Sequence, residues 1–227
     1  RMLSCYTLNS SKATAATMNP IFEYLIAPYR TYATGTILIE ATAVVTGLLS
    51  VWYAKQNKIA VYPTGMLSTG LYVYLLFQAG LLGDLLINAY YFLMSIYGWV
   101  YWTQKKEGAV LHPIETMTTL EKKGSIVLFC VSLFAVGGLY WSVGYWTSWT
   151  APVDTLTTAL FFIGMWLMAR RKIAHWIFWI VGDIISIPLY LYKGLGLTSF
   201  QYLIFTLLAI FGYLEWKKHY NKTLQTA

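Results

Sequence analysis

Polar side chains that interrupt long apolar stretches are the most informative residues of this sequence. In the segment WIFWIVGD, Trp176, Trp179 and Asp183 occur at positions i, i+3 and i+7, which places them on one face of an α-helix. Two indoles beside a carboxylate could form an aromatic box with an acidic anchor. Alternatively, the tryptophans belong to the aromatic belt of a membrane surface and the carboxylate pairs with a neighbouring helix. The first interpretation favours Trp179 and Asp183 over Trp176, which lies nearer a basic loop.

A second set of polar residues lies in the apolar segment GDLLINAYYFLMSIYGWVYW. Asn88, Tyr91 and Ser95 again occur at positions i, i+3 and i+7 and therefore share one helix face. The last apolar segment carries Gln201 at nearly the corresponding place. These amides could bind a polar ligand between the two segments, or they could hydrogen-bond one helix to another. The first interpretation adds Asn88, Tyr91 and Gln201 to the candidate binding residues.

Two carboxylates, Glu40 and Asp154, lie 114 residues apart within corresponding apolar segments. Together with Asp84 they would make one mouth of the protein acidic, and such a field concentrates cationic solutes. The helix dipole also stabilises carboxylates near helix N-termini, which is a sufficient explanation for Asp84 and Asp154. Glu40 lies deeper in its segment and is therefore a candidate binding residue.

The composition shows which elements must position these residues. Of the 227 residues, 58% are hydrophobic and only 11% are charged, whereas about 25% are charged in soluble domains. A transmembrane helix needs about 20 mostly apolar residues, and its backbone groups are paired within the segment. Seven stretches qualify: 34–54, 59–79, 84–103, 124–142, 151–169, 173–192 and 199–216. We therefore expect an all-α integral membrane protein with seven transmembrane helices.

The seven segments contain an internal repeat. The third segment ends in YGWVYW and the seventh in FGYLEW, so Gly98 and Trp102 lie 114 residues before Gly212 and Trp216. The same offset, without a gap, aligns Trp52 with Trp166, Ile59 with Ile173, Ala60 with Ala174 and Leu93 with Leu207. Internal repeats are typical of secondary transporters, whose substrates bind near the bilayer midplane between the repeats.

The repeat predicts an arrangement of three, one and three helices. Three spans reverse the direction of the chain, so a single fourth span lets the second triplet enter the membrane in the same direction as the first. Two parallel three-helix bundles result, related by an axis along the membrane normal. The expected divisions are an N-terminal segment 1–33 with an interfacial helix over 20–32, a first bundle 34–103, a linker with a possible surface helix and the fourth span 104–150, a second bundle 151–217, and a tail 218–227.

Basic residues divide unevenly between the two sides of the membrane. One side holds Arg1, Lys12, Arg30 and Lys193, and the other holds Lys55, Lys58, Lys105, Lys106, Lys122, Lys123, Arg170, Arg171, Lys172, Lys217, Lys218 and Lys222. Since basic loops stay in the cytoplasm, we expect the N-terminus outside, the C-terminus in the cytoplasm and Trp102 in the cytoplasmic aromatic belt. The net charge of +7 then mostly reflects the orientation of the protein in the membrane and does not indicate nucleic-acid binding.

No pattern of catalytic or metal-binding residues is visible in the sequence. Cys5 and Cys130 are far apart, and His112, His175 and His219 do not have metal-ligand spacing. A retinal-binding photoreceptor would need a lysine in the last span, and residues 199–216 contain none. We therefore predict no enzymatic activity, no metal and no cofactor, with a membrane-embedded enzyme or assembly subunit as the alternative.

Taken together, these features resemble the Pnu vitamin transporters. The resemblance covers residues 20–220. It rests on the arrangement of three, one and three spans, on the [FY]-G-[WY]-x-x-W ending of both triplets, and on W-x-x-W-x-x-x-D followed by Pro188, Leu189 and Tyr190. Within the family the sequence is most similar to members that carry nicotinamide riboside. The architecture is similar to that of the SWEET sugar transporters, in a full seven-span form.

The resemblance implies facilitated diffusion of nicotinamide riboside through the inner membrane of a bacterium, with trapping by phosphorylation in the cytoplasm. It also implies a homotrimer in the lipid bilayer. The pyridinium cation, amide and ribose of this solute suit indoles, amides and a carboxylate, and no Lys or Arg lies near these residues to bind a phosphate. Thiamine, riboflavin and a sugar are the alternative substrates. The candidate binding residues are Glu40, Asn88, Tyr91, Trp176, Trp179, Asp183, Tyr190 and Gln201.

Overall fold

The structure is a computed structural model that describes residues 33–79, 82–106, 109–146, 148–192 and 196–226. The chain divides into two units, Arg1–Ile37 and Leu38–Ala227. In the first unit the described residues open helix α2, and the interfacial helix expected over 20–32 lies outside the described residues. The second unit contains all of the other elements.

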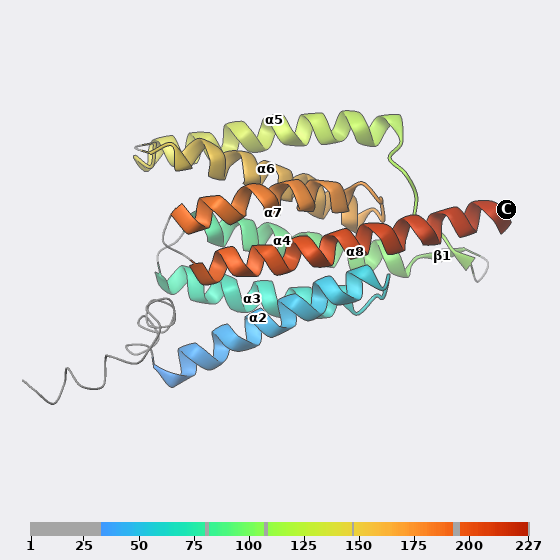
Figure 1. Cartoon of the computed structure of the whole chain (residues 1–227), viewed down its shortest axis with the longest axis horizontal. Helices are drawn as coiled ribbons and strands as arrows, with labels where there is room; N and C mark the ends of the chain where they lie inside the picture. The colour runs from blue at the N-terminus through green and yellow to red at the C-terminus, as the bar shows by residue number, and fades with distance from the viewer. Residues whose placement is uncertain (1–32, 80–81, 107–108, 147, 193–195, 227) are drawn as a thin grey trace, which may run out of the picture. The chain divides into compact units, whose positions relative to one another are not determined.

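Seven α-helices make up most of the described part of the chain (Figure 1). They are α2 (Thr34–Lys55), α3 (Val61–Ala79), α4 (Leu82–Thr103), α5 (Thr119–Ser142), α6 (Thr150–Ala169), α7 (His175–Tyr192) and α8 (Gly196–Thr226). We call α2–α4 the first triplet and α6–α8 the second triplet. The prediction of an all-α protein is confirmed, apart from a small hairpin between α4 and α5.

Two helices extend beyond their predicted spans. Helix α5 begins before the predicted residue 124 because Thr118 and Glu121 form a capping box: the Thr118 hydroxyl accepts from the Glu121 N–H at 3.2 Å, and the Glu121 carboxylate accepts from the Thr118 N–H at 2.9 Å. Helix α8 continues past residue 216 to Thr226, since this stretch contains neither glycine nor proline. Hydropathy marks where apolar sequence ends, whereas capping and propensity decide where the helix ends.

Five helices are long and apolar enough to cross a membrane: α2, α5, α6, α7 and the part of α8 from Ser199 to Gln225. Helices α3 and α4 are of similar length but interrupt their apolar sequence with Thr69, Asn88 and Ser95. These three side chains line an internal cavity. Polar residues in membrane helices face the interior of the protein because lipid does not solvate them. The predicted membrane spans over α3 and α4 stay predictions.

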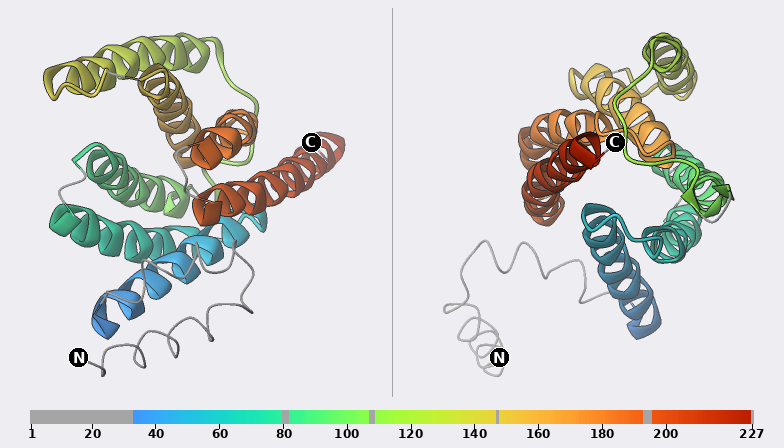
Figure 2. Two further views of the ribbon diagram at one scale, coloured as in Figure 1. Left: turned by 60° about the vertical axis from the view of Figure 1, so that its left-hand side comes forward. Right: turned by 90° about the vertical axis from the view of Figure 1, so that its right-hand side faces the viewer.

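Helix α6 contacts three other helices, α4, α5 and α7, while α7 also packs against α8 and α3 packs against α4. Helix α5 lies at one edge, beside α6 (Figure 2). Two hydrogen bonds hold α2 to α3, from Ser50 Oγ to Val61 O at 2.8 Å and from Ser68 Oγ to Ala43 O at 2.7 Å. The second triplet is therefore closely packed, α2 is held to α3 by these two hydrogen bonds, and α5 joins the bundle mainly through α6.

The described part of the linker between α4 and α5 does not form the surface helix that we expected. Strands β1 (Lys105–Lys106) and β2 (Ala109–Val110) form an antiparallel hairpin. Farther along, the Glu115 N–H donates to Arg171 O at 3.2 Å, and the Ile173 N–H donates to Glu115 O at 3.0 Å. This parallel bridge pairs the backbone N–H and C=O groups of Glu115 with the α6–α7 loop. The linker can therefore pair its backbone without forming a helix.

Each triplet is packed around a glycine of its last helix. A Cβ atom at Gly98 would lie 2.4 Å from the ring of Tyr62, and one at Gly212 would lie 2.6 Å from the ring of Trp176. Tyr62 and Trp176 are 114 residues apart in the sequence, and both are completely buried. The same contact of an aromatic ring on a glycine therefore recurs in both triplets.

The tryptophans that follow these glycines join the two triplets. Trp102 Nε1 donates to Ala169 O at 3.2 Å, and Trp216 Nε1 donates to Ala54 O at 2.8 Å. Only 6% of Trp102 and 1% of Trp216 is exposed. The interpretation of Trp102 as a residue of the aromatic belt is wrong, because a belt tryptophan keeps its ring at the lipid surface and this ring is enclosed by protein.

Replacing Gly212 with alanine should lower the temperature of thermal unfolding, because the added Cβ would lie 2.6 Å from the buried ring of Trp176. Overpacking of this kind costs about 1–3 kcal/mol. Gly138→Ala is the matched control, since a Cβ at this helical glycine would meet nothing within 4 Å, and alanine is the better helix former. Equal unfolding temperatures for the two variants in the same detergent would contradict this packing.

Candidate functional site

A cavity of about 260 Å³ lies between the two triplets and is partly open to its surroundings. All six helices of the triplets contribute side chains to its lining, and α5 contributes none. Sites for small molecules usually measure about 300–1,000 Å³. The cavity is therefore suited to a compact ligand.

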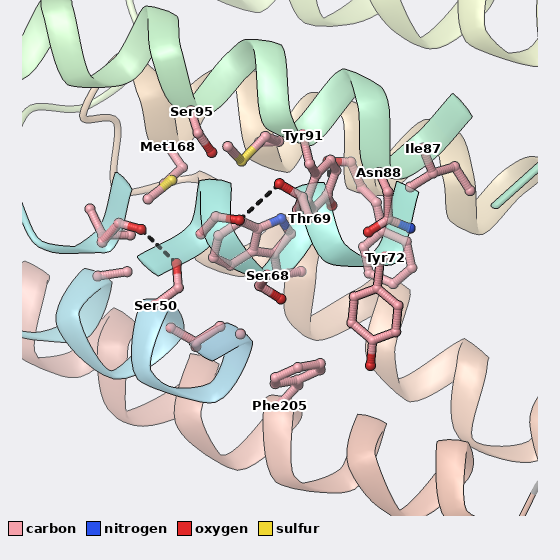
Figure 3. Close-up of a pocket in the computed structure, with 18 of the residues that line it drawn as sticks. Ser50, Ser68, Thr69, Tyr72, Ile87, Asn88, Tyr91, Ser95, Met168 and Phe205 are labelled. Atoms are coloured by element: carbon pink, nitrogen blue, oxygen red, sulfur yellow. Dashed lines mark hydrogen bonds between the residues drawn. The ribbon is translucent and has the colours of Figure 1, made fainter. Parts of the chain in front are cut away.

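Five of the predicted binding residues line this cavity: Asn88, Tyr91, Trp179, Asp183 and Gln201. They come from α4, α7 and α8, which the sequence alone could not bring together. Figure 3 shows Asn88 and Tyr91 among the other lining side chains. The helix faces that the spacing i, i+3, i+7 predicted are thus turned toward a common space.

Trp176, in contrast, lies outside the cavity lining. Its ring is completely buried against Gly212 and lies 5.9 Å from the ring of Trp216, centroid to centroid. This environment also differs from that of a belt tryptophan. Trp176 belongs to the packed core next to the cavity.

Glu40 and Tyr190 are two further candidates that do not line the cavity. The ring of Tyr190 lies 5.1 Å from that of Tyr202, and Glu40 interacts electrostatically with Tyr72. Tyr72 and Tyr202 are both lining residues. Each of the two residues is thus next to a tyrosine of the lining, and a direct role for Glu40 or Tyr190 in binding stays a prediction.

The cavity is built from corresponding positions of the two repeats. Eighteen of its 24 lining residues form nine pairs with the offset of 114 residues. The pairs are Gly47 with Phe161, Val51 with Met165, Ala54 with Met168, Gly65 with Trp179, Thr69 with Asp183, Ile87 with Gln201, Asn88 with Tyr202, Tyr91 with Phe205 and Ser95 with Ala209. The repeat thus supplies one set of positions twice, on opposite sides of the same space.

The two copies differ in the kind of residue that they carry. Where the first triplet has Gly47 and Gly65, the second has Phe161 and Trp179. A tyrosine, Tyr202, likewise replaces the amide of Asn88. The first triplet therefore contributes small and polar side chains, and the second triplet contributes most of the large rings.

Two glycines of the second triplet seat these rings. A Cβ at Gly164 would lie 2.4 Å from Trp179, and one at Gly182 would lie 2.6 Å from Phe161. Close approach of a ring to the backbone requires glycine at such positions. The indole of Trp179 is therefore held in one place at the wall of the cavity.

Hydroxyl groups line the opposite wall, on the first triplet. Ser50 Oγ and Ser68 Oγ donate to carbonyl oxygens of the neighbouring helix, and Thr69 Oγ1 donates to Gly65 O at 2.8 Å. Each of these oxygens keeps lone pairs that can accept a hydrogen bond. This wall can therefore receive donor groups of a ligand.

Asp183 is the only charged residue among the described residues that line the cavity. It is 5% exposed and comes from the same helix as Trp179. A buried carboxylate is costly unless a positive charge or hydrogen bonds compensate it. A cation bound between Asp183 and the aromatic rings would supply that compensation.

Four aromatic rings close the cavity toward the end of the bundle that carries Lys55, Lys58, Arg170, Arg171, Lys172 and Lys217, which we call the basic end. These are the buried rings of Tyr62, Trp102, Trp176 and Trp216. The centroids of Tyr62 and Trp102 lie 5.1 Å apart, and those of Trp102 and Trp216 lie 5.8 Å apart. The four rings belong to one buried cluster together with the lining residues Ala54, Val61, Met165, Met168 and Ala209.

Arg171 holds this closed end together. Arg171 is 9% exposed and has a positive φ of 59°. Asn57, which lies 114 residues earlier, also has a positive φ, of 54°. Arg171 Nε donates to Asn57 Oδ1 at 3.1 Å, Nη1 donates to His112 O at 2.9 Å, and the guanidinium lies 4.3 Å from the centroid of Trp102. Burial lowers the pKa of Arg171 from its usual value, although a guanidinium stays charged in proteins.

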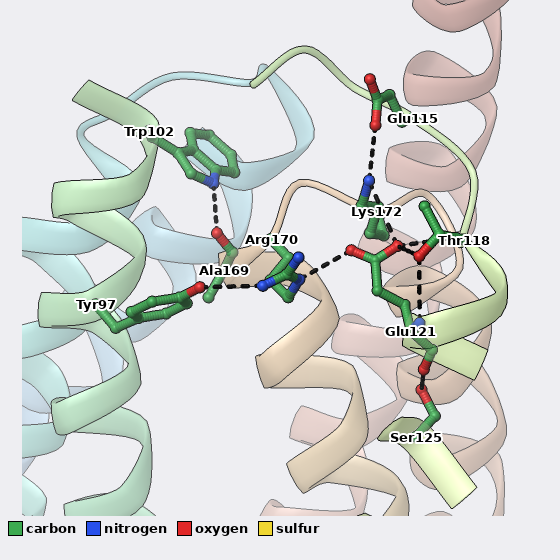
Figure 4. Close-up of polar contacts among 9 residues, drawn as sticks. All are labelled: Tyr97, Trp102, Glu115, Thr118, Glu121, Ser125, Ala169, Arg170 and Lys172. Atoms are coloured by element: carbon green, nitrogen blue, oxygen red, sulfur yellow. Dashed lines mark hydrogen bonds and ion pairs between the residues drawn. The ribbon is translucent and has the colours of Figure 1, made fainter. Parts of the chain in front are cut away.

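A second set of charges attaches α5 and the linker to the same loop (Figure 4). Arg170 Nε lies 2.8 Å from Glu121 Oε1, and Lys172 Nζ lies 2.7 Å from Glu115 Oε2 and 3.5 Å from Glu121 Oε2. Arg170 also donates to the Tyr97 hydroxyl at 3.3 Å. Glu121 is 3% exposed, and a charge buried to this extent is normally paired. The loop is therefore fixed to α4, the linker and α5 together.

Several lining residues were not predicted from the sequence, among them Ser68, Thr69, Phe161, Tyr202 and Phe205. The signal that could have found Tyr202 and Phe205 was present in the sequence. Applying the offset of 114 residues to Asn88 and Tyr91 leads directly to Tyr202 and Phe205. The same offset leads from Asp183 back to Thr69. Ser68 has no such signal, because hydroxyl side chains are common in membrane helices.

Known proteins similar to this chain are membrane transporters. A family model described as nicotinamide mononucleotide transporter matches residues 37–218. The nicotinamide riboside transporter PnuC of Escherichia coli (strain K12) is 24% identical over 210 residues, which cover 78% of this chain and 84% of that protein. The protein of the same name from Neisseria mucosa is 26% identical over 195 residues, covering 79% and 72% of the two chains.

Two further similarities are informative. The riboflavin/roseoflavin transporter RibM of Streptomyces davaonensis is 24% identical over 174 residues, covering 76% of this chain and 81% of that protein. The crystal structure of the vitamin B3 transporter PnuC superimposes with a TM-score of 0.61 at 20% identity, covering 87% of this chain and 88% of that one. A likeness at this identity shows that the two chains share a fold.

The charge of the cavity can be tested without a ligand. In a protein whose Cys5 and Cys130 are replaced by serine, we expect Ser95→Cys to react with a small cationic methanethiosulfonate at least about 10-fold faster than with an anionic one, because Asp183 attracts cations. Ser132→Cys, equally buried at 3% but on α5, should react slowly with both. Equal rates of the two reagents at Ser95→Cys, or no reaction there, would contradict an accessible acidic cavity.

Proposed function

The chain belongs to the nicotinamide mononucleotide transporter family, and from this premise we propose that it carries nicotinamide riboside across a membrane by facilitated diffusion. The observation that carries the proposal is the cavity between the triplets, which combines Asp183 with aromatic rings and amides. The pyridinium of nicotinamide riboside matches the carboxylate and the ring faces. Its carboxamide and ribose hydroxyls match Asn88 and Gln201.

The lining favours the riboside over the mononucleotide. A phosphate group is normally bound by Arg, Lys or backbone N–H groups, and the described residues of the lining include no Arg or Lys. The phosphate would also add negative charge beside Asp183. The description of the family names the mononucleotide, whereas the relatives from E. coli and N. mucosa are named for the riboside, and the chemistry of this cavity supports the second assignment.

Riboflavin is the second candidate, because RibM is also a relative. Its ribityl chain could use the same amides and hydroxyls. Riboflavin, however, carries no positive charge to compensate Asp183, which is 5% exposed. Thiamine does carry a charge but has only one hydroxyl group. The combination of one carboxylate with several hydrogen-bonding side chains therefore supports nicotinamide riboside.

We propose that the two triplets run parallel, in the arrangement of three, one and three helices known from SWEET-like transporters. The nine repeat-related pairs in the lining support this arrangement, as do the matched bonds of Trp102 to Ala169 and Trp216 to Ala54. Transport by such a protein requires the triplets to move against each other around the bound solute. Release at the basic end must then break the contacts of Arg171 with Asn57 and Trp102.

The proposed location is the inner membrane of a bacterium. The basic end would face the cytoplasm, with the C-terminus there and the N-terminus outside, because twelve of the sixteen basic residues belong to the loops at this end. Phosphorylation in the cytoplasm would then prevent the riboside from returning. The proposal of a homotrimer rests on the family resemblance.

Purified protein in liposomes should bring nicotinamide riboside to equal concentrations inside and outside, without accumulation and without response to a proton or sodium gradient. Nicotinamide mononucleotide should not enter, because the described residues of the lining include no basic side chain to bind its phosphate. The measurement is the time course of labelled solute inside the vesicles. Accumulation above the outside concentration, driven by either gradient, would contradict facilitated diffusion and would direct attention to Asp183 and Glu40.

Variants of the lining provide the control for this experiment. Trp179→Ala removes a ring face from a cation, a loss of about 0.5–2 kcal/mol or roughly 3- to 30-fold in affinity. Asn88→Leu should weaken binding at least as much, since it leaves a substrate polar group unpaired. Trp141→Leu is the matched control, because Trp141 on α5 is 75% exposed and lies outside the cavity. Wild-type affinity in both lining variants would mean that the solute binds elsewhere.

A further inference from the structure

We propose that the solute occupies the cavity in one orientation, with its hydroxyl groups against Ser50, Ser68 and Thr69 and its aromatic ring against Trp179 and Phe161. This inference rests on the proposed function, because it specifies how a riboside binds at that same site. It assigns Ser50, Ser68 and Thr69 as residues that determine specificity for a hydroxylated solute. The three side chains come from α2 and α3, and the rings come from α6 and α7.

The hydrogen bonds within the protein fix the chemical character of the hydroxyl wall. Ser50 Oγ donates to Val61 O at 2.8 Å, Ser68 Oγ donates to Ala43 O at 2.7 Å, and Thr69 Oγ1 donates to a carbonyl within its own helix. Each side chain thereby uses its single proton. Each oxygen then has only its lone pairs available, and these can accept hydrogen bonds but cannot donate them. The wall therefore binds groups that donate, such as ribose hydroxyls, and repels groups that only accept, such as phosphate oxygens.

Two glycines make room for these oxygens where α2 and α3 meet. A Cβ atom at Gly65 would lie 2.9 Å from Ser50 Oγ, and one at Gly47 would lie 2.9 Å from Ser68 Oγ. Any larger residue at these positions would cover the oxygens with carbon. Gly47 and Gly65 line the cavity together with Ser50 and Ser68.

The repeat explains why the orientation is unique. The same two positions of the second triplet carry Phe161 and Trp179, so a ring can stack there and finds no partner ring at Gly47 or Gly65. Asp183 lies beside Trp179 on α7, and its counterpart in the first triplet is Thr69. Reversing the solute would direct its cation to the hydroxyls and its ribose to the rings. The reversed solute would bind more weakly, because its pyridinium would lose the ring faces of Trp179 and Phe161 and the carboxylate of Asp183.

The experiment compares two ligands on the purified full-length protein by titration calorimetry. The ligands are nicotinamide riboside and the 1-methylnicotinamide cation, which has the same charged ring and amide but no sugar. Ser68→Ala and Ser50→Ala should each weaken the riboside about two- to tenfold and leave 1-methylnicotinamide unchanged, because only the riboside has hydroxyls to lose. Trp179→Ala should weaken both ligands by a similar factor. Ser125→Ala is the matched control: it removes a buried helix hydroxyl that donates to Glu121 O at 2.9 Å and lies outside the cavity.

The affinity for the riboside divided by the affinity for 1-methylnicotinamide, measured within one variant, decides the result. Any loss of folded protein affects both ligands alike and leaves this ratio unchanged. A lower ratio in both serine variants, together with an unchanged ratio in Trp179→Ala and Ser125→Ala, supports the orientation. An unchanged ratio in both serine variants overturns it, whether their affinities fall together or stay at the wild-type level. Failure of the wild-type protein to bind either ligand would instead overturn the proposed function.

Discussion

The structure depends on a pair of matched hydrogen bonds that cross between the triplets. Trp102 and Trp216 end the two repeats, and each donates its indole N–H to a backbone carbonyl of the other triplet, at 3.2 and 2.8 Å. Lipid offers no alternative partner for a polar group, so these bonds are favoured wherever the geometry allows them. They require the first helix of each triplet to meet the last helix of the other. The two triplets therefore enclose a space, and the four buried rings near these bonds close it at the basic end.

Positions 114 residues apart supply most of the cavity lining, and the residues at these positions differ in chemistry. The packing contacts are alike in both copies, as the seating of Tyr62 on Gly98 and of Trp176 on Gly212 shows. The lining, in contrast, differs at nearly every pair, from Gly65 opposite Trp179 to Thr69 opposite Asp183. A solute with one charged ring and one hydroxylated end is matched by such a divided cavity. A site with two identical walls would bind such a solute equally well in either direction.

Much of the fold follows from the sequence because two simple signals are strong. The apolar stretches gave the helices, and the offset of 114 residues grouped them. The start of α5 at Thr119 could not be read from hydropathy, because the capping box of Thr118 and Glu121 lies in a polar linker. The linker itself depends on its bridge to the α6–α7 loop, a contact between segments far apart in the sequence. Such contacts leave no periodic pattern.

The candidate site was predictable where a polar residue was unusual for its surroundings. Asn88 and Asp183 interrupt apolar helices, and both line the cavity. The same reasoning failed for Trp102 and Trp176, since tryptophan is common both at membrane surfaces and in packed cores, and both rings are buried in the structure. Phe161 drew no attention as one aromatic residue among many. Its role becomes visible only beside Gly47, its counterpart in the other repeat.

The most direct test of this account is a titration of the purified protein with nicotinamide riboside, nicotinamide mononucleotide, thiamine and riboflavin under one set of conditions. The cavity with one carboxylate, no basic side chain in its described lining and a wall of hydroxyl acceptors predicts the tightest binding for the riboside and no measurable binding for the mononucleotide. Binding of the mononucleotide as tight as that of the riboside would contradict the account, and so would tighter binding of the uncharged riboflavin.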